Sequence, residues 1–146
     1  MTDPVLRSFR SEDLVHIVGD HVAPYLIDQA KRGLTFTAEW DGCPIGCGGI
    51  VICWPGFGSC WLLASPLITE HRLWLIRIVR RVIAEISQAL SLYRLEALAV
   101  STPTQEYGRW LELIGFTREQ DGCATAYTPK GLDMIRYQLV RRTDHG

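Results

Sequence analysis

The sequence is poor in lysine, with Lys31 and Lys130 as its two copies, and arginine supplies the rest of its 15 basic side chains. Sixteen acidic side chains bring the formal net charge to −1. Proteins that bind nucleic acid through bulk charge are normally basic, so this balance argues against that class. The arginine bias fits a GC-rich gene. It also suits planar, bidentate contacts with carboxylate or phosphate groups.

Paired cysteine motifs are lacking. The five cysteines are an odd number, and no Cys-x-x-Cys occurs. This argues against a disulfide scaffold and a structural zinc site, and we expect no bound metal. Four of the cysteines (Cys43, Cys47, Cys53 and Cys60) lie in one strand-rich stretch, where we expect them to act as small buried hydrophobic residues.

Export and membrane signals are also lacking. The N-terminal residues Met1–Pro4 contain no basic segment followed by an apolar one. The apolar stretch Ile45–Ile68 is interrupted by Gly, Pro and Ser, and the helical run Leu73–Leu90 carries several charges. Neither has the length and continuity of a membrane span. We therefore predict a cytoplasmic protein that has no membrane partner.

The composition and periodicity predict one globular α/β (α+β) domain over residues 1–146, since 47% of the side chains are hydrophobic and 21% are charged. The expected order is β-α-α-β-β-β-α-β-α-β-β, which implies a mixed, mostly antiparallel sheet with helices on both faces. The first five expected strands are Pro4–Arg10, Leu34–Trp40, Pro44–Trp54, Ser59–Leu67 and Arg94–Val100, and the candidates for the final strands are Thr117–Gln120, Cys123–Tyr127 and Met134–Val140. The expected helices run from an N-cap at Ser11 to Gly19, from Pro24 to Gly33, from Glu70 to Ser91 behind an N-cap at Thr69, and from a cap at Thr102 or Thr104 to Ile114.

Three local features make this order similar to the GNAT superfamily of acyl-CoA-dependent N-acetyltransferases. Residues 39–46 (E-W-D-G-C-P-I-G) resemble a family hairpin, and the strand Ser59–Leu67 leads directly into the long helix. Residues 109–116 (R-W-L-E-L-I-G-F) resemble the family's "R-F-Y-E-K-L-G-F" element. A narrower likeness, through W-L-L-x-S at residues 61–65 and R-W-L-x-x-x-G-F, is to GNAT-like proteins of tailed phages.

The resemblance implies that acetyl-CoA is the co-substrate. Its diphosphate would bind at the start of the long helix, where Thr69, His71 and Arg72 are the candidate ligands. Residues 67–74 contain no glycine, unlike the family loop, and Glu70 would repel a phosphate. The pantetheine arm would pair with the backbone of the preceding strand at Leu63, Ala64 and Ser65, at an open strand edge.

The resemblance also points to an acid and a base. The family tyrosine that protonates the leaving thiolate is replaced here by Leu111, and Tyr107, one helical turn earlier, is the candidate substitute. The strand-borne carboxylates Glu39 and Glu96 are the candidate bases, and burial would have to raise their pKa values. Histidines that titrate near neutrality without such help stand at 16, 21 and 71.

The first expectation is thus an N-acetyltransferase acting on a small amine or a protein amine. The alternative is a catalytically degenerate phage protein with a structural role in the virion or a host-protein partner, located in the host cytoplasm or the virion. The missing glycines and the missing tyrosine support that alternative. Arg77, Arg80 and Arg81 form a helix face that is usually solvated and that also suits a partner surface. Nucleic-acid binding through this face is the least favoured expectation.

Overall fold

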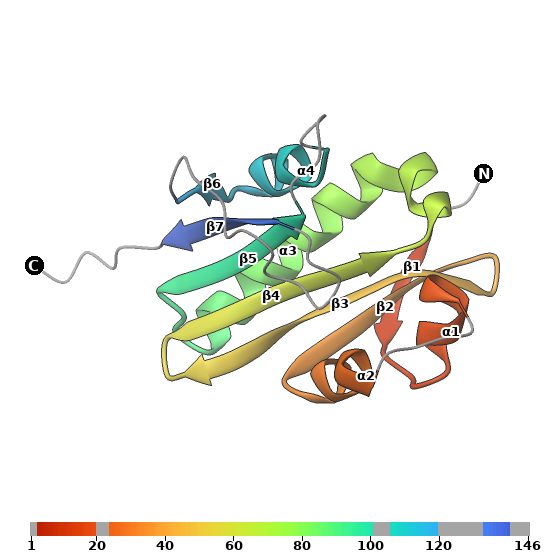
Figure 1. The fold of residues 1–146 in the computed structure, drawn as a ribbon, viewed down its shortest axis with the longest axis horizontal. Helices are drawn as coiled ribbons and strands as arrows, with labels where there is room; N and C mark the ends of the chain where they lie inside the picture. Colours follow the sequence, from red (N-terminus) through yellow and green to blue (C-terminus); the bar gives the residue numbers. More distant parts are fainter. Residues whose placement is uncertain (1–2, 20–23, 101–105, 120–132, 141–146) are drawn as a thin grey trace, which may run out of the picture. The chain divides into compact units, whose positions relative to one another are not determined.

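The computed structural model describes residues 3–19, 24–100, 106–119 and 133–140 (Figure 1). The element order matches the prediction, with a 3-10 helix added before the long helix. The elements are β1 (Val5–Ser8), α1 (Asp13–Val18), α2 (Pro24–Lys31), β2 (Leu34–Trp40), β3 (Cys43–Trp54), β4 (Phe57–Ala64), η1 (Pro66–His71), α3 (Arg72–Ala89), β5 (Arg94–Val100), α4 (Glu106–Ile114), β6 (Thr117–Arg118) and β7 (Met134–Val140). The predicted strand Cys123–Tyr127 and the predicted caps Thr102 and Thr104 lie outside the described residues.

The strands form a seven-stranded sheet in the order β1-β2-β3-β4-β5-β7-β6. The pairs β1–β2, β2–β3, β5–β7 and β6–β7 are antiparallel. The predicted α/β class with a mostly antiparallel sheet is therefore confirmed. The chain divides into two compact units. Unit 1 comprises Met1–Val51 and Cys60–Leu75, and unit 2 comprises Ile52–Ser59 and Ile76–Gly146.

In unit 1, β2 and β3 are joined by a two-residue turn. Asp41 and Gly42 have φ values of 52° and 77°. Two successive residues with positive φ are what a type I′ hairpin turn requires, and aspartate followed by glycine is a preferred pair there. The turn thus fixes where β2 ends and β3 begins.

A β-bulge interrupts the pairing of β2 and β3 just beyond this turn. Ala38 lies opposite Gly46, but its neighbour Glu39 lies opposite Pro44, so Ile45 is an extra residue on β3. Proline has no N–H group to donate to the ladder, which suits a place where regular pairing is broken. The side chain of Ile45 is completely buried.

The core of unit 1 lies between its helices and its strands. Figure 1 shows α1 and α2 beside β2. The buried core residues are Leu14 and Ile17 from α1, Ala30 from α2 and Cys47 from β3, with Phe9, Ile27, Trp61 and Leu63 packed against them. The helix α1 begins at Asp13 behind Glu12, whose side chain makes no capping hydrogen bond. The predicted N-cap at Ser11 is therefore wrong.

The cysteines do not share one environment. Cys47 is buried and Cys60 half-buried, whereas Cys43 and Cys53 are exposed, so the expectation of buried cysteines is wrong for those two. Burial raises the pKa of Cys60 to about 12. Burial, and to a lesser extent the charge of Asp13, does the same for Cys47. Neither buried thiol is a nucleophile near neutral pH.

The start of the long helix differs from the prediction. The strand β4 ends at Ala64 rather than Leu67, and the 3-10 helix η1 runs without a break into α3. The N–H group of Ile68 donates to the carbonyl of Ser65, at 3.1 Å, and Ser65 precedes the whole helical run. Thr69 is therefore inside the run and not its N-cap.

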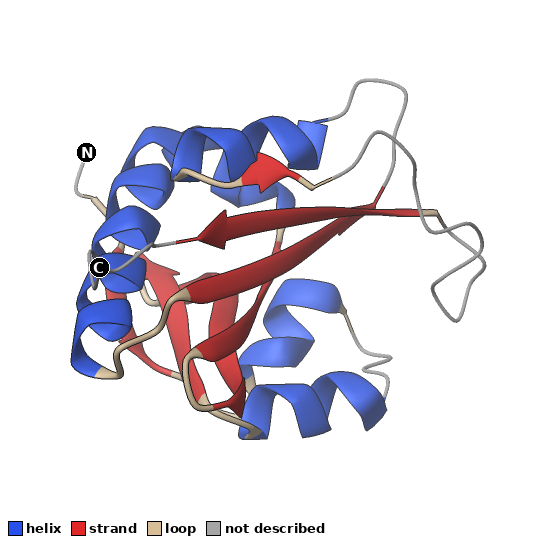
Figure 2. Cartoon of the chain, turned by 90° about the vertical axis from the view of Figure 1, so that its left-hand side faces the viewer, coloured by secondary structure: helices blue, strands red, loops and turns tan. Residues whose placement is uncertain are grey.

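In unit 2, β5 and β7 pair along their full lengths, from Arg94 opposite Val140 to Val100 opposite Met134. Figure 2 shows α4 running beside the short strand β6, and α4 also contacts β5 and β7. The buried residues of this unit come from several elements: Phe57, Ile83, Leu92, Leu95, Ala97, Ile114, Phe116, Ile135 and Tyr137. The tight turn at Gly56 is held by its carbonyl, which accepts hydrogen bonds from the N–H groups of Tyr93 and Arg94.

The C-terminus of α3 ends in a Schellman motif. Ser91 has a φ of 53°, and its N–H group donates to the carbonyl of Gln88, at 3.4 Å. The N–H group of Leu92 donates to the carbonyl of Ser87, at 2.8 Å. This pattern places Ser91 at the position where glycine is preferred, because a Cβ atom is disfavoured at positive φ.

Ser91→Gly is therefore expected to raise the free energy of unfolding by about 0.5–1 kcal/mol, as the relief of backbone strain exceeds the added chain entropy. Urea denaturation followed by circular dichroism measures this change. The matched control is Ser59→Gly on β4, where a glycine adds entropy without relieving strain and should destabilise the protein. A Ser91→Gly variant no more stable than the native chain would contradict the proposed capping geometry.

Candidate functional site

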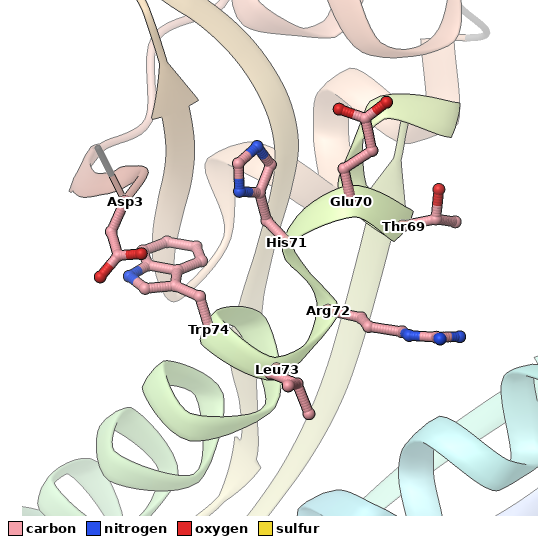
Figure 3. A pocket seen from close by; sticks show the side chains of 7 residues that line it. All are labelled: Asp3, Thr69, Glu70, His71, Arg72, Leu73 and Trp74. Carbon is pink, nitrogen blue, oxygen red and sulfur yellow. The ribbon is translucent and has the colours of Figure 1, made fainter. Parts of the chain in front are cut away.

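A pocket of about 340 Å³ lies where η1 meets α3, within unit 1 (Figure 3). Seven residues line it: Asp3, Thr69, Glu70, His71, Arg72, Leu73 and Trp74. Three of them, Thr69, His71 and Arg72, are residues that the family resemblance marks as candidate cofactor ligands. The structure thus brings half of the six predicted cofactor residues to one concave surface.

Thr69 contributes less to an anion site than predicted. Its hydroxyl donates to the carbonyl of Pro66, at 2.8 Å, and so has no second hydrogen for a phosphate. The N–H groups left unpaired by a helix are those of its first turn. Because η1 precedes α3, that first turn begins at Pro66, which has no N–H group. The backbone at residues 69–72 is therefore not a free helix N-terminus.

His71 lies against Trp40, with a ring-centroid distance of 4.9 Å and an interplanar angle of 49°. Its Nε2 atom is buried and has no hydrogen-bond partner among the described residues. A buried imidazole nitrogen without a partner is costly unless water or a ligand meets it. His71 thus lines the pocket with its ring against Trp40.

Arg72 is the strongest candidate for binding an anion. Its side chain is exposed and points away from His71 and Trp74 in Figure 3. Within the described part of the chain it makes no ion pair. Glu70 and Asp3, which also line the pocket, are acidic and oppose a phosphate. The pocket thus combines one exposed arginine with two acidic side chains, and a diphosphate would meet a favourable charge on the side of Arg72 alone.

The predicted pantetheine-binding residues lie at the end of β4. Leu63 packs against the core of unit 1, and Ala64 is exposed. The N–H group of Ser65 donates to the carbonyl of Ile45, at 2.9 Å, so this group is already used. The Ser65 hydroxyl is buried and has no described partner. None of these three residues lines the pocket, although they immediately precede η1.

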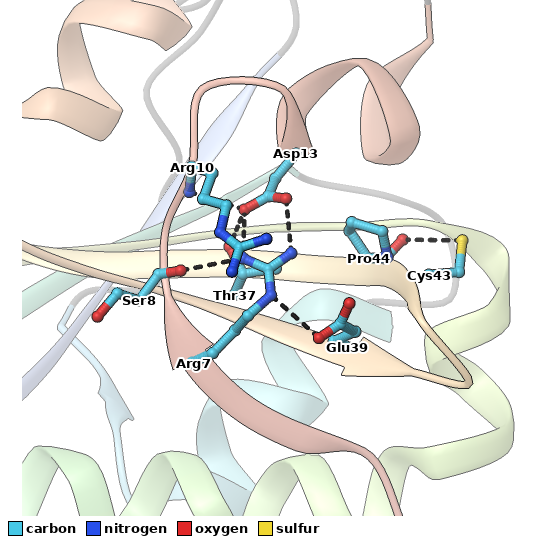
Figure 4. Close-up of polar contacts among 8 residues, drawn as sticks. All are labelled: Arg7, Ser8, Arg10, Asp13, Thr37, Glu39, Cys43 and Pro44. Carbon is cyan, nitrogen blue, oxygen red and sulfur yellow. Dashed lines mark hydrogen bonds and ion pairs between the residues drawn. The ribbon is translucent and has the colours of Figure 1, made fainter.

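Glu39, a predicted base, belongs to a network that links β1, α1 and β2 (Figure 4). The Nε atom of Arg7 donates to Glu39 at 3.1 Å, and the two terminal nitrogens of Arg7 bind both carboxylate oxygens of Asp13, at 2.9 and 2.7 Å. Thr37 donates its hydroxyl to Asp13 at 2.7 Å, and the N–H group of Arg10 donates at 2.8 Å. Glu39 would have to share its arginine contact to accept a proton from an amine.

The ionised states in this network stabilise each other. Burial by itself raises the pKa of Asp13, but the hydrogen bonds from Arg7, Arg10 and Thr37 outweigh it and hold that pKa below its usual value. The hydrogen bond to Asp13 likewise raises the pKa of Arg7. The network therefore has the character of a structural clamp, and no sequence motif marks it.

Glu96, the other predicted base, lies on β5 in unit 2. Arg94 donates to one of its oxygens at 3.3 Å, and the Nε atom of Arg136 lies 3.7 Å from the other. Arg94 also binds Glu119, at 2.9 Å, and Gln138, at 2.7 Å. Glu96 is thus one member of a polar network that joins β5, β7 and Glu119, the residue after β6.

Tyr107, the predicted acid, is exposed on α4 and makes no hydrogen bond with another described residue. Leu111, at the position of the family tyrosine, is half-buried, and its carbonyl accepts the N–H groups of Gly115 and Phe116. No described hydrogen bond or ion pair joins Tyr107 to Glu96. The structure therefore leaves the three predicted catalytic residues as separate candidates: Glu39 in unit 1, and Glu96 and Tyr107 in unit 2.

Asp3 is the pocket residue that sequence reasoning missed. It precedes the first strand, far along the chain from η1, and nothing in its neighbours predicts that it would reach the start of α3. Trp40 was likewise not connected to His71. Both contacts arise from long-range packing, which periodicity and motif spacing do not report.

Comparison with known proteins shows similarity at the level of structure. No family model and no curated protein matches the sequence. Among solved structures, the ribosomal-protein-S18-alanine N-acetyltransferase from Escherichia coli covers 98% of this chain and 98% of its own, with a TM-score of 0.72 and 14% identity. A spermidine N-acetyltransferase variant from Vibrio cholerae covers 93% of this chain and 94% of its own, with a TM-score of 0.68 and 13% identity.

A third similar structure comes from Salmonella typhimurium and contains its cofactor acetyl-CoA. It covers 99% of this chain and 98% of its own, with a TM-score of 0.70 and 12% identity. The chain has the GNAT fold. The GNAT fold extends over nearly all of its length, as the element order predicts. These three similar proteins are bacterial, so they give no support to the narrower resemblance to phage proteins.

Among the described helices, none combines the length and the apolar character that crossing a membrane requires.

Proposed function

We propose that the chain is an acyl-CoA-dependent N-acetyltransferase that acts on a small amine or a protein amine, with acetyl-CoA as co-substrate. The proposal treats residues 1–146 as a single GNAT-like domain. One observation supports this proposal in addition to the fold. Three residues that the family resemblance marks as cofactor ligands line one pocket at the start of α3. The structure similar over 99% of this chain that contains acetyl-CoA supports the choice of co-substrate.

In this proposal Arg72 binds the diphosphate through charge-assisted hydrogen bonds, and His71 and Trp74 shape the pocket beside it. Acetyl-CoA supplies the acetyl group as a thioester. The amine must lose a proton and the thiolate must gain one. Glu39 and Glu96 remain the candidate bases and Tyr107 the candidate acid. Holding amine and thioester together would provide a large part of the rate enhancement.

Arg72→Glu is expected to weaken acetyl-CoA binding at least about tenfold, because it removes a charge-assisted contact and adds repulsion. Isothermal titration calorimetry measures the affinity. Arg32→Glu is the matched control: Arg32 is an exposed arginine in the same unit, just after α2, and its reversal should leave the affinity unchanged.

The native chain must itself bind the co-substrate. No heat and no thermal shift at about millimolar acetyl-CoA would remove the enzyme proposal, since this is the upper end of common KM values. Unchanged affinity in Arg72→Glu would refute the site but not the activity. Release of free thiol with spermidine or with a peptide that begins with alanine, the acceptor types of the similar proteins, then identifies the acceptor class.

A second candidate is a GNAT-fold protein without catalysis that serves in an assembly or in an interaction with another protein. Leu111 favours it, because this residue stands at the position of the family tyrosine and has no proton to transfer. Acetyl-CoA binding without any thiol release across the amine panel would support this candidate over the enzyme.

A further inference from the structure

The helix α3 carries three exposed arginines on one face within unit 2. They are Arg77, Arg80 and Arg81. Side chains three and four positions apart are neighbours on a helix surface, so the three guanidinium groups share one side of α3. The opposite side of the helix carries Val79, Val82 and Ile86, which are half-buried.

This face has little internal charge compensation. The one ion pair that the described residues provide joins Arg81 to Glu85 at 3.9 Å, with side-chain exposures of 68% and 72%. An exposed pair at that distance contributes little to stability. Arg77 and Arg80 make no ion pair or side-chain hydrogen bond with any described residue.

The arrangement is unfavourable for the isolated helix. Like charges at spacings of three and four residues destabilise a helix. A favourable interaction with the helix dipole is confined to the last turn, whereas residues 77–81 lie in the middle of α3. Apart from the weak pair of Arg81 with Glu85, the three arginines make no described contact that stabilises the fold. An external partner would account for their presence.

We propose that this face of α3 is a docking surface for an acidic helical segment of another protein. Glutamates or aspartates at positions i, i+3 and i+4 of such a segment match the spacing of Arg77, Arg80 and Arg81. Guanidinium groups bind carboxylates in a bidentate manner, which lysine could not do. The inference is independent of the acetyltransferase proposal, because it concerns neither the pocket nor Arg72.

Nucleic acid fits this surface less well. Residues 76–89 contain no aromatic side chain on which a base could stack. The net charge of −1 gives no long-range attraction for a polyanion.

The test uses the full chain and a fluorescein-labelled helical peptide with glutamates at i, i+3 and i+4. Fluorescence anisotropy at low salt should show binding that weakens as salt is added. The double variant Arg77→Gln/Arg80→Gln should weaken it about tenfold, since it removes two of the three contacts. Arg109→Gln, which changes an exposed arginine on α4 in the same unit, is the matched control and should leave binding unchanged.

Thermal unfolding separates docking from a structural role. The double variant should unfold at the same temperature as the native chain or a higher one, because it relieves repulsion on α3. A lower unfolding temperature would assign the arginines to stability and overturn the inference. So would absence of peptide binding, equal binding of a scrambled peptide with the same composition, or tighter binding of a single-stranded RNA.

Discussion

Asp13→Asn is expected to lower the free energy of unfolding by about 3–5 kcal/mol, because it leaves Arg7 without the buried carboxylate that compensates its charge. Asp13 is 1% exposed, and four hydrogen bonds converge on its two oxygens. Asparagine has nearly the same shape, so the effect reports on charge and not on a cavity. Urea denaturation of the native and variant chains measures it.

The matched control is Asp28→Asn, an exposed aspartate on α2 in the same unit. It should change stability by less than about 0.5 kcal/mol. If Asp13→Asn lowered the free energy of unfolding as little as this control does, the network of Figure 4 would not hold β1, α1 and β2 together.

The pH dependence of the same variant gives an independent check. The folded pKa of Asp13 lies below its unfolded value of about 3.9, so its stabilisation is present above that pH and is lost as the pH falls towards the folded pKa. The stability gap between the native chain and Asp13→Asn should therefore be wide at about pH 7 and narrower at about pH 3. A gap that widens in acid would contradict the direction of the shift.

Gly108→Ala is expected to destabilise the protein by about 2 kcal/mol, although alanine is the better helix former. A Cβ atom at position 108 would lie 2.0 Å from the hydroxyl oxygen of Tyr137 and 2.9 Å from its Cζ. Tyr137 is 2% exposed and cannot swing away. Overpacking of this kind costs about 1–3 kcal/mol, more than the gain of about 1 kcal/mol in helix propensity. Thermal or urea unfolding measures the change.

The control is a double-mutant cycle with Tyr137→Phe. Removing the hydroxyl relieves the shorter contact, so Gly108→Ala should cost less in the phenylalanine background than in the native one. An equal cost in both backgrounds would place the strain elsewhere. Burial raises the pKa of Tyr137, with a smaller contribution from Glu112, so the phenol stays neutral during these measurements.

Helices and strands could be predicted from the sequence where apolar residues recur with one clear period and where turn or cap residues mark both ends of the segment. The strands Leu34–Trp40, Arg94–Val100 and Met134–Val140 have the predicted bounds. The turn at Asp41 and Gly42 follows from local conformational preference alone. These features depend on residues that are neighbours in the sequence, so a single sequence is enough to predict them.

The start of α3 was not predictable from the same kind of evidence. Thr69 has the chemistry of an N-cap, but Ser65 and Pro66 begin a 3-10 helix earlier and draw Thr69 into it. The nearly continuous apolar run of the predicted strand Ser59–Leu67 is typical of a strand buried on both faces, yet Leu62 and Ala64 are exposed. Helix ends and strand burial depend on which distant segments pack there.

The position of the pocket could be predicted from the sequence, but the partners of the candidate bases could not. The family resemblance points to the segment around Thr69, His71 and Arg72, and the pocket lies there. It does not reveal that Arg7 holds Glu39, or that Arg94 and Arg136 hold Glu96. The ion pairs of Arg7 with Glu39 and of Arg136 with Glu96 join residues far apart in the sequence, and Arg94 binds Glu96 from two positions away on β5.

The bulge at Ile45 has a consequence for how the chain folds. In a strand pair, a slip of one residue turns every side chain to the opposite face. Such a slip of β2 would turn Thr37 and Glu39 away from Arg7 and Asp13. The extra residue and the turn at Asp41 therefore belong to the alignment of the hairpin in which Thr37 and Glu39 meet Asp13 and Arg7.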